Sequence, residues 1–252
     1  MINPFENEQR RAFKDSIAKF LEAEVWPHVD AWDEAGAYPH EMNEKICALG
    51  VFGFDIPEEY GGLGFDDAHM RKASGVEMGR SSAGGLMASV GSRSIMLKPL
   101  TELANDEIRQ RVLPELLSGR KGGALGITEP GGGSDVANLK TTARRDGNHW
   151  VISGSKTFIT NGQQADLIIV IAKTDPSLGS KGISLMMVET AEAPGFARGR
   201  NLEKLGLKSQ DTSELFFDNV RLPPENLLGG TEGQGFYQLM KSLPQERLIV
   251  AL

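Results

Sequence analysis

The chain has 252 residues, of which 40% are apolar and 24% charged, and its 27 basic and 34 acidic residues give a formal net charge of −7. This length and apolar content suffice for one large domain or two ordinary ones with a real core, and they exclude a disordered or low-complexity chain. The excess of acid and the lack of a basic run argue against nucleic-acid binding, which needs clustered cations facing phosphates.

The numbers of cysteines and histidines and their positions limit the disulfides and metal sites that the chain can form. The single cysteine, Cys47, allows neither an intramolecular disulfide nor a cysteine zinc site, so we expect a reducing, cytoplasmic setting. The four histidines are scattered along the chain, so we expect no metal site. No apolar run approaches the roughly 18 to 20 residues of a membrane span, and we expect neither a membrane partner nor a secretory signal.

The first part of the sequence has helical periodicity. We expect a first helix with Asn3 as its N-cap and Pro4 at its first position, limited by Pro27. Further helices are expected over residues 41–49, 67–79, 85–97 and 105–117. Residues 1–120 are therefore predicted to form an N-terminal helical domain.

After Gly122 the pattern changes to short apolar runs bounded by turn residues. Strands are predicted over residues 139–145, 149–153, 167–172, 183–188 and 213–220, with a hairpin turn at 146–148. Too little helix separates them for a parallel sheet, so an antiparallel β-barrel is favoured, with a sandwich as the alternative. We predict a middle β-barrel domain at 121–227.

Helical spacing returns near residue 233 and reaches the last residue without a cap. We therefore expect residues 228–252 to form a helix that belongs to a longer protein. The predicted fold class is α+β, with the helical domain, the antiparallel barrel and this helix in chain order.

The segment Gly126-Ile-Thr-Glu-Pro-Gly-Gly-Gly-Ser-Asp135 ends a strand and opens a loop of glycines and short hydroxyl side chains. Three consecutive glycines let backbone N–H groups approach an anion such as a pyrophosphate. Neither a Walker lysine nor a following helix is present, so this is no P-loop and no Rossmann fingerprint. The alternative is a flexible turn between strands.

Phe158 and Thr160 stand two residues apart in a strand, so both should face the same side. A flat aromatic ring beside a hydroxyl group is suited to binding a planar heterocycle. The alternative is a core phenylalanine and an edge threonine.

Glu246 lies within an apolar stripe formed by Leu239, Leu243 and Val250. A carboxylate in such a stripe is paired, protonated or chemically active, because burying it unpaired is costly. A carboxylate with a raised pKa is a useful general base, and Pro244 should open space beside it. The alternatives are that Glu246 pairs with Arg247, or that it lies at a solvent-exposed edge of the stripe.

Together with the loop at 126–135, the segments Phe158-Ile-Thr-Asn-Gly162 and Gly206-Leu-Lys-Ser-Gln-Asp-Thr212 resemble the acyl-CoA dehydrogenases. The resemblance covers the whole chain, including Glu59-Tyr-Gly-Gly62. The run Leu243-Pro-Gln-Glu-Arg247 is most similar to the long-chain branch of that family.

The resemblance implies that residues 228–252 are the first helix of a C-terminal helical bundle. It also implies FAD as the cofactor and assigns residues to two sites. Those along FAD would be Leu125, Ile127, Thr128, Gly133, Ser134, Phe158, Ile159 and Thr160. Those near the CoA thioester substrate would be Ser134, Ser180, Lys181, Tyr237, Pro244, Gln245 and Arg247. Glu246 would be the catalytic base, because the long-chain and isovaleryl branches carry it in this helix.

The reaction that the resemblance implies is α,β-dehydrogenation of a fatty acyl-CoA to a trans-2-enoyl-CoA, a step of fatty acid β-oxidation. An electron-transferring flavoprotein would take the electrons, and the full-length form would be a homotetramer or a dimer. Two rival interpretations remain: an oxygen-using offshoot such as an acyl-CoA oxidase or flavin monooxygenase, and a truncated, non-catalytic paralogue that binds FAD or acyl-CoA.

Overall fold

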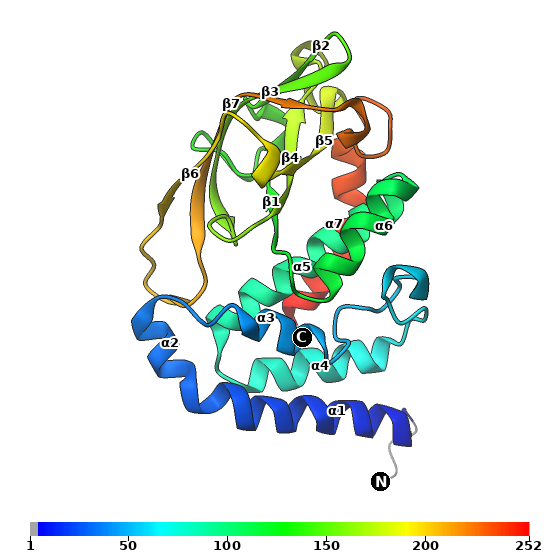
Figure 1. Cartoon of the computed structure of the whole chain (residues 1–252), viewed down its shortest axis with the longest axis vertical. Coiled ribbons are helices and arrows are strands. Elements are labelled where there is room, and N and C mark those ends of the chain that lie inside the picture. Colours follow the sequence, from blue (N-terminus) through cyan, green and yellow to red (C-terminus); the bar gives the residue numbers. More distant parts are fainter. Residues whose placement is uncertain (1–4, 252) are drawn as a thin grey trace.

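The computed structural model describes residues 5–251, without the side chains of residues 245, 246 and 249–251. The helices before the sheet are α1 (Glu8–Phe20), α2 (Val29–Ala35), α3 (Glu41–Cys47), α4 (Ala68–Arg80), α5 (Gly84–Leu103) and α6 (Asp106–Leu117). The strands are β1 (Gly123–Gly126), β2 (Thr142–Asp146), β3 (His149–Thr160), β4 (Leu167–Lys173), β5 (Ile183–Glu189), β6 (Phe196–Asn201) and β7 (Thr212–Leu222), and α7 (Gly235–Ala251) follows them. The predicted order of helices, sheet and helix is confirmed (Figure 1).

The helical part differs from the prediction at three points. Asn7 caps α1, its side chain accepting from the Arg10 N–H at 2.8 Å, whereas the predicted cap at Asn3 lies outside the described residues. The helical backbone does not end at Pro27 but continues through a short π turn and a 3₁₀ turn into α2. Helix α5 runs on past Pro99 to Leu103, because its flanking leucines are buried and their burial offsets the proline's cost of about 3 kcal/mol.

The sheet is a curled, mixed half-barrel rather than a wholly antiparallel barrel. Strand β4 pairs with β5 on one edge, and on its other edge β1 and the first residue of β2 lie parallel to it. The remaining pairs, β2 with β3, β3 with β7 and β7 with β6, are antiparallel. The predicted hairpin at residues 146–148 is confirmed, since Asp146 pairs with His149 across Gly147 at φ 60°.

Strand β4 explains how the sheet joins the helices. Its residues alternate between two clusters: Leu167, Ile169 and Ile171 pack toward α5, α6 and α7, whereas Ile168, Val170 and Ala172 pack inside the curled sheet. Burial on both faces accounts for the unbroken apolar run of this strand. A further cluster, around Ile17, Ile46 and Leu86, holds α1, α3 and α5 together. Figure 1 accordingly shows α5, α6 and α7 between the sheet and the outer helices.

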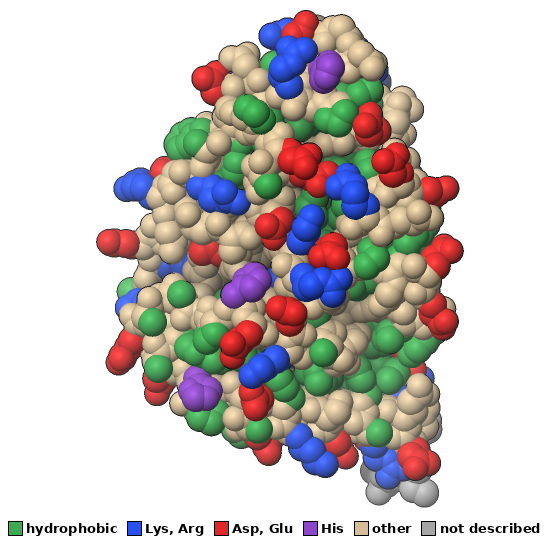
Figure 2. Space-filling model, in the orientation of Figure 1, with side chains coloured by type: hydrophobic (Ala, Val, Ile, Leu, Met, Phe, Trp, Pro, Cys, Tyr) green, Lys and Arg blue, Asp and Glu red, His purple; other side chains and the backbone are tan. Residues whose placement is uncertain are grey.

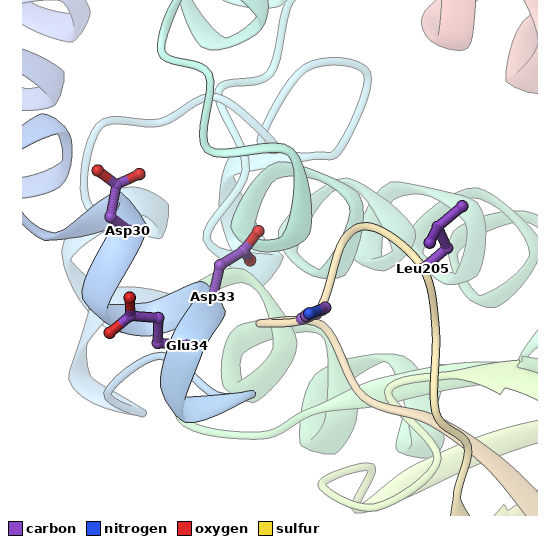
Figure 3. Close-up of a pocket in the computed structure, with 5 residues that line it drawn as sticks. Asp30, Asp33, Glu34 and Leu205 are labelled. Atoms are coloured by element: carbon purple, nitrogen blue, oxygen red, sulfur yellow. The ribbon is translucent and has the colours of Figure 1, made fainter.

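The loop between β6 and β7 reaches the helical part at α2. Asp33 accepts from the Ser209 N–H at 3.0 Å and from the Ser209 hydroxyl at 2.7 Å, and these bonds lower the pKa of the Asp33 carboxyl. Figure 3 shows Asp33 turned toward this loop, with Asp30 and Glu34 on the same helix and Leu205 opposite. Asp33 is therefore a link between two segments far apart in sequence.

Asp33→Ala is expected to lower the free energy of unfolding by about 1 to 3 kcal/mol, because it removes a charged acceptor from two donors. Urea unfolding at neutral pH measures this. Asp30→Ala, an exposed carboxylate on the same helix, is the matched control and should change stability little. Equal effects of the two substitutions would contradict the link.

The surface carries charges of both signs. Figure 2 shows acidic and basic side chains interspersed over the face drawn there. Within residues 5–251 no helix is long and apolar enough to span a membrane. The same described residues hold no group of three or more His, Cys, Asp or Glu side chains arranged to bind a metal ion.

Candidate active site

The glycine loop, residues 126–135, leaves β1 and folds back on itself. Glu129 and Gly132 exchange backbone hydrogen bonds of 3.1 and 3.0 Å around Pro130 and Gly131. None of the three glycines has a positive φ, and a Cβ added to Gly131 or Gly132 would meet no atom within 4 Å. The fold itself therefore gives no steric reason for glycine at these two positions. What their small size provides is an open stretch of backbone, as a bound anion would require.

Phe158 stands beside this loop in an unusual conformation. Its φ is 58°, it is 67% exposed, and it lies in the interruption of the β3–β7 register between Lys156 and Ile159. The alternative of a core phenylalanine is therefore wrong. A left-handed conformation costs a non-glycine residue about 1 to 2 kcal/mol. Such strain in an exposed aromatic residue is typical of a binding site.

The two residues after Phe158 are placed differently from each other. The Ile159 side chain is buried in the core inside the sheet, so only its backbone is available to a ligand. Thr160 is half-buried, and its hydroxyl accepts from Gln210 Nε2 at 2.7 Å. Because this bond occupies a lone pair of the oxygen, the hydroxyl proton is free to be donated to a ligand.

A backbone bond joins the glycine loop to the strand that carries Phe158. The Thr157 N–H donates to the Thr128 carbonyl at 2.9 Å, so Thr128 and Phe158 are close neighbours. Leu125 and Ile127 are half-buried against the cluster shared with the helices, whereas Ser134 is exposed. The glycine loop and the segment that carries Phe158 are thus joined at Thr128, whereas the side chain of Ile159 points into the core.

A buried ion pair that the sequence did not reveal lies beneath this region. Lys156 Nζ is 2.9 Å from Glu129 Oε1. Burial lowers the pKa of Lys156, against the opposing effect of Glu129. Burial alone would raise the pKa of Glu129, but hydrogen bonds from Thr141, Lys140 and Lys156 together hold it below its usual value. The carboxylate is consequently charged at neutral pH.

The segment 158–162 also meets the segment 206–212 and the helices. Asn161, at φ 63°, is buried and donates its backbone N–H to the Asp211 carbonyl at 3.2 Å. Its side-chain amide donates to the Ser89 carbonyl on α5 at 2.8 Å and accepts from the Ser89 hydroxyl. The Ser89 hydroxyl in turn bonds to the Tyr38 hydroxyl at 2.5 Å. This network fixes the end of β3 against α5.

Among the residues expected near the substrate, Ser180 and Lys181 lie in a turn that contacts α7 and the segment just after Ser134. The turn Pro176–Gly182, which carries Ser180 and Lys181, packs against the turn Val136–Asn138 and against α7. Tyr237, in the first turn of α7, is 69% exposed.

The C-terminal end of α7 is described only in part. Pro244 and Arg247 are exposed and Leu239 is buried, which agrees with an apolar stripe at its start. The side chains of Glu246, Gln245 and Val250 lie outside the described residues. The inward position of Glu246 therefore stays a prediction.

Comparison with known proteins identifies the family. Residues 7–120 match the N-terminal domain of acyl-CoA dehydrogenase, and residues 124–220 match its middle domain. Long-chain specific acyl-CoA dehydrogenase, mitochondrial, of Sus scrofa is 42% identical over 241 residues, which are 95% of this chain and 55% of that protein. The chain thus spans about half the length of the curated relatives it matches.

Solved structures of acyl-CoA dehydrogenases have the same fold as this chain. The acyl-CoA dehydrogenase from Geobacillus kaustophilus superposes with a TM-score of 0.92 at 40% identity, covering 99% of this chain and 65% of that one. A glutaryl-CoA dehydrogenase from Mycobacterium smegmatis in complex with FADH2 gives 0.88 at 31%, covering 98% and 61%. The glycine loop and the strained Phe158 agree with these matches, which show that the chain belongs to the acyl-CoA dehydrogenase family.

Proposed function

We propose that the chain provides the FAD site, the catalytic base and part of the substrate site for α,β-dehydrogenation of a fatty acyl-CoA. The observation that carries this proposal is the exposed, left-handed Phe158 beside an open glycine loop. A strained aromatic wall next to accessible backbone amides fits a cofactor that joins a flat ring system to a pyrophosphate.

The residues present fit FAD. The residues that would hold it are Leu125, Ile127, Thr128, Gly133, Ser134, Phe158, Thr160 and the backbone of Ile159. When bound, FAD supplies the acceptor for the hydride that leaves the substrate. Phe158 would pack against the ring system, and the Thr160 hydroxyl would donate to its edge.

On the substrate side, Glu246 would accept the α-proton of the thioester. Substrate contacts are proposed for Ser134, Ser180, Lys181, Tyr237, Pro244, Gln245 and Arg247. We further propose that the chain divides into domains at residues 1–120, 121–227 and 228–252. The electron acceptor would be an electron-transferring flavoprotein, and the full-length protein would be a homotetramer or a dimer. It would act in fatty acid β-oxidation and have a cytoplasmic location.

The test of this function is a visible spectrum of the purified chain, followed by anaerobic addition of acyl-CoAs of different chain length. Flavin absorption that bleaches with an acyl-CoA supports the proposal. A burst of peroxide in air would favour the oxygen-using alternative. Bound flavin that no acyl-CoA reduces would favour the non-catalytic paralogue.

Thr160→Ala is expected to slow flavin reduction about tenfold while changing the FAD dissociation constant less, because a hydrogen bond at the reacting edge of the cofactor matters most in the transition state. Stopped-flow reduction and fluorescence titration measure the two quantities. Thr160→Ser keeps the hydroxyl and serves as the control. Loss of affinity without slower reduction would place Thr160 elsewhere along the cofactor.

A further inference from the structure

The buried Glu129–Lys156 pair is not among the residues proposed to contact FAD. The Lys156 side chain is 0% exposed and that of Glu129 is 7% exposed. Burying two charges costs several kcal/mol per ion, so such a pair is weak evidence for added stability and is better understood through the conformation it fixes.

Each member of the pair contacts backbone at the base of the glycine loop. Glu129 accepts from the Lys140 N–H at 2.5 Å and from the Thr141 N–H at 2.9 Å, where the chain returns from the loop. Lys156 Nζ also donates to the Ile127 carbonyl at 3.1 Å, where the loop begins. The pair therefore ties both ends of the loop to β3.

On the β3 side, Lys156 is the last residue in register before the interruption that carries Phe158. In a regular strand Lys156 and Phe158 would share a face. Here Lys156 is buried under the loop and Phe158 is exposed, so the interruption turns the two side chains apart. A lysine anchored by Glu129 and Ile127 holds the strand at this point.

We propose that Glu129 and Lys156 are positioning residues, which fix the distance between the glycine loop and the aromatic wall at Phe158 and so preset the cofactor site. This inference rests on the proposed function, because FAD is the ligand that would use both elements.

The first experiment is Lys156→Met, which keeps the apolar length of the side chain and removes the charge. Amide hydrogen exchange of the apoprotein is expected to rise about tenfold in peptides covering 127–135 and 156–160, with little change in α1 and α4. The dissociation constant for FAD should rise roughly 10- to 100-fold. This is the size of effect seen in metal sites when a residue that orients a metal ligand, without touching the metal, is removed. Visible circular dichroism of any residual bound flavin should change as well.

The matched control is Lys45→Met. Lys45 Nζ lies 2.7 Å from Glu24 Oε2, but both side chains are more than 40% exposed. This substitution removes a lysine–glutamate pair of similar length far from the loop, and exchange and FAD affinity should stay within twofold of the parent.

A second variant covers the possibility that an unpaired buried carboxylate unfolds the chain. Glu129→Gln combined with Lys156→Met leaves no buried charge at this site and keeps an amide oxygen for the Thr141 N–H, although the new amide nitrogen cannot accept from the Lys140 N–H. It should restore thermal stability toward that of the parent and still bind FAD weakly. Recovery of both stability and FAD affinity would mean that the pair is structural only.

The outcomes separate this inference from the proposed function. Unchanged exchange in 127–135 and 156–160 overturns the positioning role, and so does increased exchange with unchanged FAD affinity. A parent chain that binds no FAD contradicts the proposed cofactor, whereas the exchange comparison still decides whether the pair holds the loop and the wall together.

Discussion

Glu246→Gln is expected to slow anaerobic flavin reduction by a fatty acyl-CoA by a factor of roughly 10² to 10⁴, the range for loss of a general base. Glutamine keeps the shape and hydrogen bonding of the side chain but cannot accept the α-proton. The sequence predicts that Glu246 belongs to an apolar stripe of α7, and the first residue of this stripe, Leu239, is buried. FAD content should not change, because the carboxylate is not among the proposed cofactor contacts.

The control for this substitution is Glu225→Gln. Glu225 is exposed in the turn Pro224–Asn226, so losing its charge should leave the reduction rate unchanged. If the Glu246 variant reduces its flavin at the parent rate, the base lies elsewhere, and pairing of Glu246 with Arg247 becomes the better interpretation of the stripe.

Gly132→Val is expected to raise the FAD dissociation constant on the order of 100-fold or more, because a branched side chain would fill the open backbone that faces the proposed pyrophosphate. A Cβ at this position meets nothing within 4 Å in the chain itself, so the variant should fold normally. At Gly133, by contrast, a Cβ would lie 3.2 Å from Thr128 Cγ2, so a substitution there disturbs the loop as well. Fluorescence titration with FAD and thermal unfolding measure the two effects.

The matched control is Gly79→Val. Gly79 lies on α4, where a Cβ also meets nothing within 4 Å. Valine there should leave FAD affinity unchanged. If the Gly132 variant binds flavin with the affinity of the parent, the open backbone at Gly132 does not contact the cofactor. The flexible turn that the sequence left open as the alternative then becomes the better interpretation of the loop.

Periodicity was sufficient to predict most elements of the fold. Helical spacing predicted α1, α3, α4, α5 and α6, and short apolar runs between turn residues predicted β2, β3, β4, β5 and β7. These signals are local, since they depend on which face of each element is buried. Strand β6 has no such signal, because it is an edge strand paired only with β7 and its side chains are mostly exposed.

Pairing partners could not be predicted in the same way. The parallel alignment of β1 with β4 brings together residues more than 40 positions apart, and no turn fixes it. The helix α5 continues through Pro99 because the surrounding core outweighs a local preference. Both features depend on burial summed over the whole fold.

Within the site, the amino-acid sequence was sufficient to predict the glycine loop, the Phe158–Thr160 pattern and the family resemblance, because each is a short run whose residue types carry the chemistry. The outward position of Phe158 and the inward position of Lys156 follow from the fold, since an interrupted register breaks the alternation that sequence reasoning assumes. Only the fold joined Gln210 to Thr160, and Lys156 to Glu129. These contacts depend on how distant segments pack, and packing energy is not encoded in any one segment.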